Sequence, residues 1–135
     1  QLFAYKPFPS YAGEVEDKEA IYRKTKFAYC YENVANLPDY ISEKIFDCFF
    51  GGCVPVYWGS HTIANHIPSA CFVDRRNFKS TAEVHSYLLS IDEHEYSRYQ
   101  ENIRAFLESQ KALAFDTTSY VSTIIEKILK DLKNA

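Results

Sequence analysis

The sequence lacks methionine, long apolar runs and an excess of basic residues. No run approaches the roughly 18 apolar residues of a membrane-spanning helix, and the N-terminus lacks the charge and size order of a signal peptide. The formal net charge is −3, and Lys and Arg are scattered along the chain, so the basic stripe typical of nucleic-acid binding is missing. We therefore expect a soluble protein without a nucleic-acid partner.

The chain also begins at Gln1 rather than at a methionine. We expect that this residue is not a translation start and that further residues of the same protein precede it. The four cysteines lie in apolar segments, form no C-x-x-C pair and have no histidine at zinc-ligand spacing. They are predicted to be reduced core residues, which favours a cytosolic location.

What is present is typical of one globular domain. The chain has 135 residues, of which 47% are hydrophobic and 24% charged, enough to form a sizeable core. Short apolar runs at 26–31, 53–58 and 71–74 predict three strands. Between the first two, Ile41, Ile45, Cys48 and Phe49 form the apolar stripe of a helix within 40–52. Strands alternating with such helices predict an α/β fold with a parallel sheet and flanking helices.

Further helices are predicted on both sides of this unit. The acids of 14–24 precede its bases, as a helix dipole favours. Ser80 and Glu83 have capping-box spacing, and apolar periodicity continues through 93–111 and from about 118 to the end. The last of these helices has lysines opposite a wide apolar stripe. We interpret that stripe as core packing, with binding to a membrane surface as the alternative.

The loop from Glu32 to Tyr40 is the candidate binding site. Ligands of parallel sheets collect beyond the carboxyl ends of the strands, and a helix start can hold an anion. Lys44 is predicted near such a start, where a cation is unfavourable unless an anion is bound. Tyr40, four residues earlier, would lie beside it on the helix surface. The alternative, with equal weight on the residues alone, is a solvated Glu43–Lys44 pair behind an Asp39 N-cap.

The stretch "KFAYCYENVANLPDYISEKIFDCFFGGCVPVYWGS" closely resembles the signature of the α-1,3-fucosyltransferases, glycosyltransferase family 10. That signature reads roughly K-F-x-x-x-F-E-N, a short spacer, D-Y-x-T-E-K, a helix and V-P-V-x-x-G. Tyr31 and Ser42 are mild departures, where Phe and Thr are usual. A weaker resemblance continues through "IPSACFVDRRNFKSTAEVHSYL".

The resemblance implies a fold and a donor site. The chain would be a single Rossmann-like domain, residues 1–135, forming the C-terminal half of a two-domain GT-B glycosyltransferase that binds GDP-fucose. Lys44 would contact the pyrophosphate, Glu43 the ribose hydroxyls, and Tyr40 the phosphate or fucose region. Glu32 and Asn33 would line the same pocket.

The resemblance also implies an inverting transfer of fucose to an N-acetylglucosamine or glucose unit. The general base and most acceptor contacts would belong to an N-terminal domain, so this chain alone is expected to be inactive. No Asp-x-Asp motif is apparent, and no cofactor or metal is expected to be required. A cytoplasmic location, with peripheral membrane association of the full-length protein, would suit a bacterial member, and the Golgi lumen a eukaryotic one.

Three weaker candidates border this site. Tyr11 precedes the signature, Gly59 would allow close backbone approach to a ligand, and Ser60 could cap a short helix facing it. His61 and His66 are not at a useful metal spacing, and the arginines of "DRR" at 74–76 are interpreted as solvated. A non-catalytic nucleotide-sugar-binding module and a GT-B enzyme with a different donor, such as a UDP-sugar, stay open as alternatives.

Overall fold

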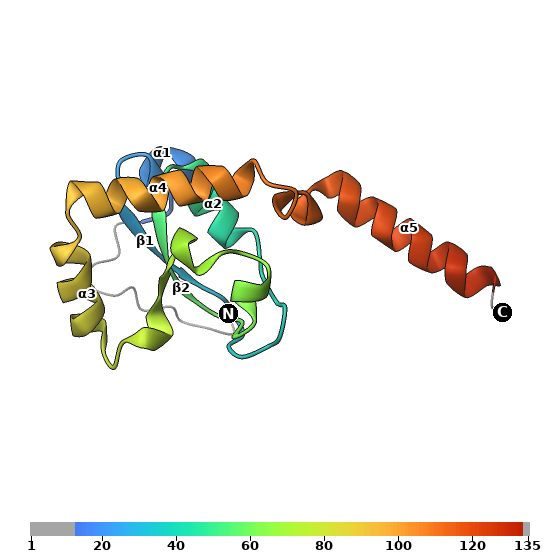
Figure 1. The fold of residues 1–135 in the computed structure, drawn as a ribbon, viewed down its shortest axis with the longest axis horizontal. Coiled ribbons are helices and arrows are strands. Elements are labelled where there is room, and N and C mark those ends of the chain that lie inside the picture. The colour runs from blue at the N-terminus through green and yellow to red at the C-terminus, as the bar shows by residue number, and fades with distance from the viewer. Residues whose placement is uncertain (1–12, 134–135) are drawn as a thin grey trace.

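The computed structural model describes residues 13–133, so Tyr11 lies outside the described residues. Its sheet has three parallel strands, β1 (Phe27–Tyr31), β2 (Val54–Trp58) and β3 (Val73–Asp74), in the order β1-β2-β3. The predicted strands and α/β class are thus confirmed. All three carboxyl ends meet at one edge, where the register pairs Tyr31 with Trp58 (Figure 1). That edge is where a ligand is expected.

Helices and short 3₁₀ turns form the rest of the regular structure within residues 13–133, and the first of them, α1, precedes β1. They are α1 (Lys18–Tyr22), α2 (Lys44–Phe50), η1 (Ile63–Asn65), η2 (Ser69–Cys71), η3 (Arg75–Asn77), α3 (Thr81–Ser90), α4 (Glu93–Leu107), η4 (Ala112–Phe115) and α5 (Thr117–Lys133). The predicted N-cap of α3 is confirmed, because the Ser80 side chain accepts a hydrogen bond from the Glu83 N–H at 3.1 Å. Two predicted starts were too early: α1 begins at Lys18 and α2 at Lys44.

The core lies between the sheet, α2 and α4. In β2 every residue except Trp58 is buried, which explains its uninterrupted apolar sequence. Phe49 of α2 meets Phe106 of α4 at 6.1 Å between ring centroids. All four cysteines are buried and free, as predicted. This packing fixes where α2 starts relative to the end of β1.

The predicted core packing of the last helix is wrong for the described residues. Helix α5 extends away from the body of the domain (Figure 1), and its apolar side chains are between 41% and 69% exposed. These side chains are Val121, Ile124, Ile125, Ile128, Leu129 and Leu132. An apolar stripe predicts which face of a helix is apolar, but it does not predict which part of the protein packs against that face. Among the described residues, no helix has the length and apolarity needed to cross a membrane.

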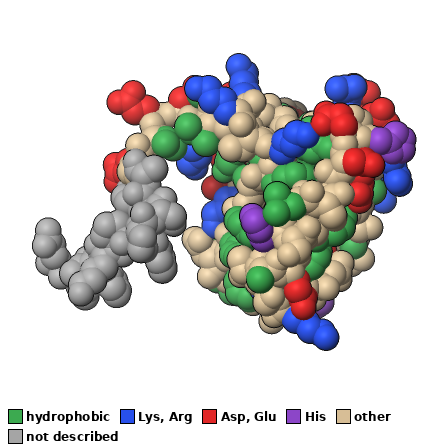
Figure 2. Space-filling model, turned by 90° about the vertical axis from the view of Figure 1, so that its left-hand side faces the viewer, with side chains coloured by type: hydrophobic (Ala, Val, Ile, Leu, Met, Phe, Trp, Pro, Cys, Tyr) green, Lys and Arg blue, Asp and Glu red, His purple; other side chains and the backbone are tan. Residues whose placement is uncertain are grey.

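Charges of both signs are interspersed on the face seen from the α3 end (Figure 2), so no basic patch stands out there.

Candidate functional site

The loop between β1 and α2 carries the predicted site and has an unusual backbone. Asn36 and Asp39 have φ angles of 61° and 60°, the left-handed conformation that Asn and Asp tolerate better than most residues. The Asn36 N–H donates to the Gly59 carbonyl at 3.4 Å. The loop is therefore folded back onto the segment that follows β2, at the carboxyl edge of the sheet.

Lys44, the first residue of α2, lies across the end of β1. Its ammonium Nζ donates to Oδ1 of Asn33 at 2.7 Å and to the carbonyl of Tyr31 at 3.0 Å. The Lys44 side chain keeps 32% of its surface exposed. The structure thus brings two of the predicted site residues, Asn33 and Lys44, into direct contact.

Glu32 lies beneath this contact rather than beside a ligand. Its side chain has no exposed surface, and its carboxylate accepts hydrogen bonds from Ser42 N–H at 2.9 Å and Ser42 Oγ at 2.6 Å. The carboxylate also lies 3.9 Å from Lys44 Nζ. Glu32 therefore holds Ser42, and through it the start of α2, and its predicted place in the donor pocket stays a prediction.

Tyr40 occupies a different position from the predicted one, whereas Glu43 lies next to Lys44 at the start of α2. Tyr40 lies in the loop, half-buried, so it is not a helical neighbour of Lys44. Glu43 is exposed and is the N-cap residue of α2, with no capping hydrogen bond from its side chain. Asp39 is not the N-cap. Among the described residues, no hydrogen bond joins either the Tyr40 or the Glu43 side chain to Lys44.

Asp39 instead ties the loop to the segment after β2. Its carboxylate accepts from Thr62 Oγ1 at 2.7 Å and contacts His66 Nε2 at 2.8 Å, while its N–H donates to Ser60 Oγ at 3.0 Å and Thr62 Oγ1 at 2.8 Å. The hydrogen bonds from Thr62 and His66 hold the pKa of Asp39 below its usual value. We call Asp39, Ser60, Thr62 and His66 the loop clasp.

The loop clasp and its surroundings change the interpretation of two weaker candidates. Ser60 is fully buried and is not the N-cap of the following η1, which is Thr62; its hydroxyl is bound within the clasp. Gly59 does allow a close approach, but by protein atoms: a Cβ there would lie 2.5 Å from Glu32 Cγ and 2.5 Å from Tyr57 Oη. The sequence predicts Asp39 and Ser60 as helix caps and gives His66 no useful metal spacing, and it carries no signal that joins them to Thr62.

Other polar candidates are engaged with protein. Asp74 binds Arg76 at 2.6 Å, so this arginine is ion-paired rather than solvated as predicted. Within residues 13–133, no group of three or more His, Cys, Asp or Glu residues could hold a metal ion.

Comparisons with known proteins point to one family. The family model described as glycosyltransferase family 10 (fucosyltransferase), C-terminal part, matches residues 7–134. The chain is 32% identical over 80 residues to α-(1,3)-fucosyltransferase FucT of Helicobacter pylori, covering 59% of this chain and 16% of that protein. It is 32% identical over 102 residues to mouse 4-galactosyl-N-acetylglucosaminide 3-α-L-fucosyltransferase 9, covering 67% of this chain and 28% of the relative.

Solved structures agree with this assignment. An α1,3-fucosyltransferase with GDP has a TM-score of 0.57 and 31% identity, over 64% of this chain and 26% of that one. An α1,3-fucosyltransferase with GDP-fucose has a TM-score of 0.59 and 26% identity, over 73% and 37%. The chain thus spans between 16% and 37% of these relatives.

Proposed function

Because the chain belongs to glycosyltransferase family 10, the fucosyltransferases, we propose that it binds GDP-fucose as the donor-binding part of an α-1,3-fucosyltransferase. The observation that carries the proposal is the contact between Lys44 and Asn33 at the carboxyl end of β1. Two structural relatives were solved with GDP and with GDP-fucose, which supports a nucleoside-diphosphate ligand.

The state of Lys44 suits a diphosphate. An ammonium group has three donors, and two of them bind neutral oxygens of Asn33 and Tyr31. The Glu32 carboxylate forms a long ion pair with Lys44 at 3.9 Å and accepts its hydrogen bonds from Ser42, so it leaves the third donor of Lys44 available. A partly exposed cation with a remaining donor favours an anion on its open side.

The neighbouring residues supply the other proposed contacts. The carboxylate of Glu43 is exposed beside Lys44 in the chain and can accept hydrogen bonds from ribose hydroxyls. Tyr40 lies on the same loop and is assigned to the phosphate or fucose region. Glu32 supports the site through its hydrogen bonds with Ser42.

The proposed reaction is an inverting transfer of fucose to an N-acetylglucosamine or glucose unit. As the bond to fucose breaks, negative charge grows on the departing GDP, and a cation fixed beforehand stabilises that charge without reorganisation of solvent. Lys44 is fixed in this way before any ligand binds. The general base and the acceptor contacts are assigned to another domain of the full protein, so this chain alone should not transfer fucose.

A calorimetric titration of the 135-residue chain with GDP-fucose, GDP, GDP-mannose and UDP-glucose tests the proposal. Binding of the guanosine ligands in preference to UDP-glucose is expected. Equal or tighter binding of UDP-glucose would favour a different donor, and transfer of fucose to an acceptor by this chain would contradict the assignment of the base to another domain. A cytoplasmic location and membrane association of the full-length protein stay predictions.

A further inference from the structure

A hollow of about 300 Å³ opens beyond the strand ends, next to the donor loop. It is lined by Tyr31, Trp58, Arg75, Arg76 and Thr81, and we call it the aromatic hollow. Its volume is at the lower end of the range for small-molecule sites. No residue assigned to the diphosphate or the ribose contributes a side chain to its lining.

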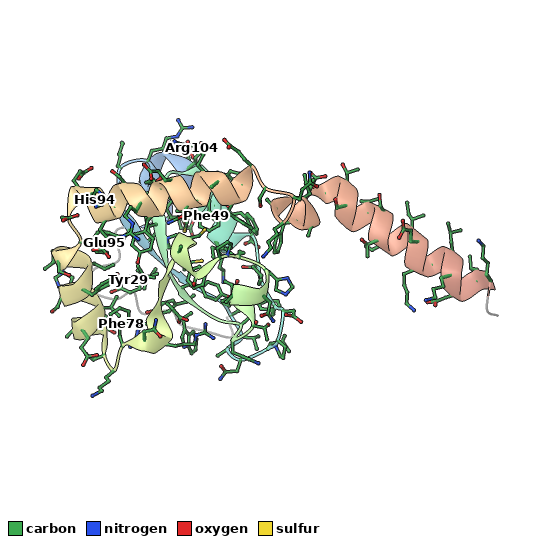
Figure 3. The ribbon with its side chains drawn as sticks, in the orientation of Figure 1. Tyr29, Phe49, Phe78, His94, Glu95 and Arg104 are labelled. Carbon is green, nitrogen blue, oxygen red and sulfur yellow. The ribbon has the colours of Figure 1, made fainter. Side chains whose placement is uncertain are left out.

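The apolar wall of the aromatic hollow consists of two rings. Tyr31 and Trp58 are register partners on β1 and β2, and their ring centroids lie 5.7 Å apart at 56°. They keep 37% and 39% of their surface exposed, whereas the residue before each of them, Cys30 and Tyr57, is buried. Tyr29, labelled in Figure 3, continues the row at 5.5 Å from Tyr31 and is 50% exposed. Large exposed rings in a row indicate a binding surface.

The polar wall is made of donors that the protein itself holds in place. Arg76 binds Asp74 through Nη2 at 2.6 Å and Nε at 2.8 Å, and Arg75 donates to the Phe78 carbonyl at 2.6 Å. Each guanidinium has five N–H donors and no acceptor, so both retain donors after these contacts. Thr81, the first residue of α3, adds a hydroxyl.

This combination matches the two sides of a pyranose ring. A pyranose presents an apolar C–H face to aromatic rings and a rim of oxygen atoms that accept hydrogen bonds. We propose that the aromatic hollow binds a pyranose ring, either the fucose of the donor or a sugar of the acceptor. The proposal deepens, and rests on, the proposed fucosyltransferase function.

Tyr31 links the two parts of the site. Its carbonyl accepts the hydrogen bond from Lys44, whereas its ring lines the aromatic hollow. The proposed diphosphate contact and the proposed sugar contact are therefore adjacent, because Tyr31 takes part in both. A nucleoside-diphosphate sugar held at Lys44 has its sugar at the end of the diphosphate, where a pyranose subsite is needed for transfer.

The chain contains a built-in reporter, because Trp58 is its single tryptophan. We would titrate the 135-residue chain with methyl α-L-fucoside and with methyl N-acetyl-β-glucosaminide, using sorbitol as a polyol that lacks a ring. A saturable change in tryptophan emission with at least one pyranoside, and none with sorbitol, is expected. A response to the fucoside identifies the donor sugar as the ligand of the aromatic hollow, and a response to the glucosaminide identifies an acceptor sugar. Emission unchanged by both sugars up to their solubility limit would overturn the proposal.

Variants separate this subsite from the diphosphate site. Saturation-transfer NMR measures pyranoside binding in variants that lack the tryptophan. Trp58→Leu should weaken pyranoside binding roughly 2- to 12-fold, as expected for loss of an aromatic contact, and Trp58→Phe should retain the binding. The matched control is Phe50→Leu, which changes an aromatic side chain that is 65% exposed on α2. GDP affinity should be unchanged by Trp58→Leu. GDP binding without pyranoside binding would overturn only the subsite, whereas pyranoside binding without GDP binding would overturn only the donor proposal.

Discussion

Nζ of Lys44 lies 2.7 Å from Oδ1 of Asn33, although the two residues are eleven positions apart. The hydrogen bond joins the first residue of α2 to the second residue after β1, so it closes the loop between them. A ligand that binds here meets a lysine whose side chain is already ordered. Less rotamer entropy is then lost on binding than for a freely moving lysine.

The first prediction concerns this lysine. Lys44→Ala removes a charge-assisted hydrogen bond, which is worth about 1.5 to 3 kcal/mol, so GDP affinity should fall roughly 10- to 150-fold in a calorimetric titration. Lys127→Ala is the control, because Lys127 is an exposed lysine on α5 that pairs only with Asp131 at 3.0 Å among the described residues. Equal GDP affinity in the two variants would return Lys44 to the role of an ordinary surface charge.

The second prediction concerns the buried carboxylate below it. Glu32→Gln replaces one carboxylate oxygen that accepts from Ser42 with an amide donor, and should lower the free energy of unfolding by about 1.5 to 3 kcal/mol. Glu43→Gln is the matched control, since that side chain is exposed, and should stay within about 0.5 kcal/mol of the parent chain. Urea unfolding measures both.

A double-mutant cycle with Ser42→Ala shows whether the two residues act as a pair. We expect a coupling energy above about 0.5 kcal/mol between Glu32 and Ser42. Additive effects would mean that burial alone, and not the contact with Ser42, explains the cost of changing Glu32.

The sequence predicted the elements better than the contacts. The three strands could be predicted because β1 and β2 are short apolar runs bounded by polar residues, a strictly local pattern. The contact of Lys44 with Asn33 could not, because it depends on how the loop folds over the end of β1. The same limit misplaced Tyr40: its spacing from Lys44 fits a helix, but α2 starts only at Lys44.

Asp39 shows a second reason. Before an apolar helical pattern, an aspartate is usually an N-cap, and local sequence offers no other partner. Its actual partners, Thr62 and His66, come from the segment after β2, 23 and 27 residues later. Hydrophobic periodicity cannot predict contacts between side chains of two different loops. The contacts of Asp39 in the loop clasp are of this kind.

The third prediction tests that clasp by pH. The pKa of Asp39 lies below its ordinary value of 3.8, because Thr62 and His66 stabilise the charged form. A lowered pKa stabilises the fold above the ordinary value, and this contribution is lost as pH falls through the folded pKa. Asp39→Asn should therefore reduce the acid-induced loss of stability. Asparagine suits a φ of 60°, so the backbone is not strained. Identical stability–pH curves below about pH 4 for parent and variant would exclude this role of Asp39.

The fourth prediction concerns the buried thiols at the alkaline end. Burial raises the pKa of Cys53 and of Cys71 from 9.0 to about 11. Between these values the unfolded state binds fewer protons than the folded state, so stability should fall as pH rises, by up to about 1.4 kcal/mol per pH unit for each thiol. Urea unfolding at several pH values in this window measures the slope. The double variant Cys53→Ala, Cys71→Ala should be less stable at neutral pH but show a shallower slope, and a slope equal to that of the parent chain would refute the assignment.

The last prediction concerns Gly59, which the sequence suggested as a place of close approach to a ligand. The space above it is occupied by Glu32 Cγ and Tyr57 Oη, each 2.5 Å from where a Cβ would lie. Neither neighbour can yield easily: Glu32 is held by Ser42, and Tyr57 is fully buried with its hydroxyl accepting from Ser60 N–H at 3.1 Å. Gly59→Ala should therefore destabilise the chain by about 1 to 3 kcal/mol, as overpacking does.

The same substitution should also weaken GDP binding, because displacing Glu32 shifts Ser42 and the start of α2 that carries Lys44. Gly52→Asn is the control: its φ of 73° suits asparagine, and no atom lies within 4 Å of a Cβ there. Unfolding and GDP titrations of both variants decide between two roles for Gly59. Loss of GDP affinity with unchanged stability would mean that Gly59 leaves room for the ligand after all, whereas loss of both places it in the support of Glu32.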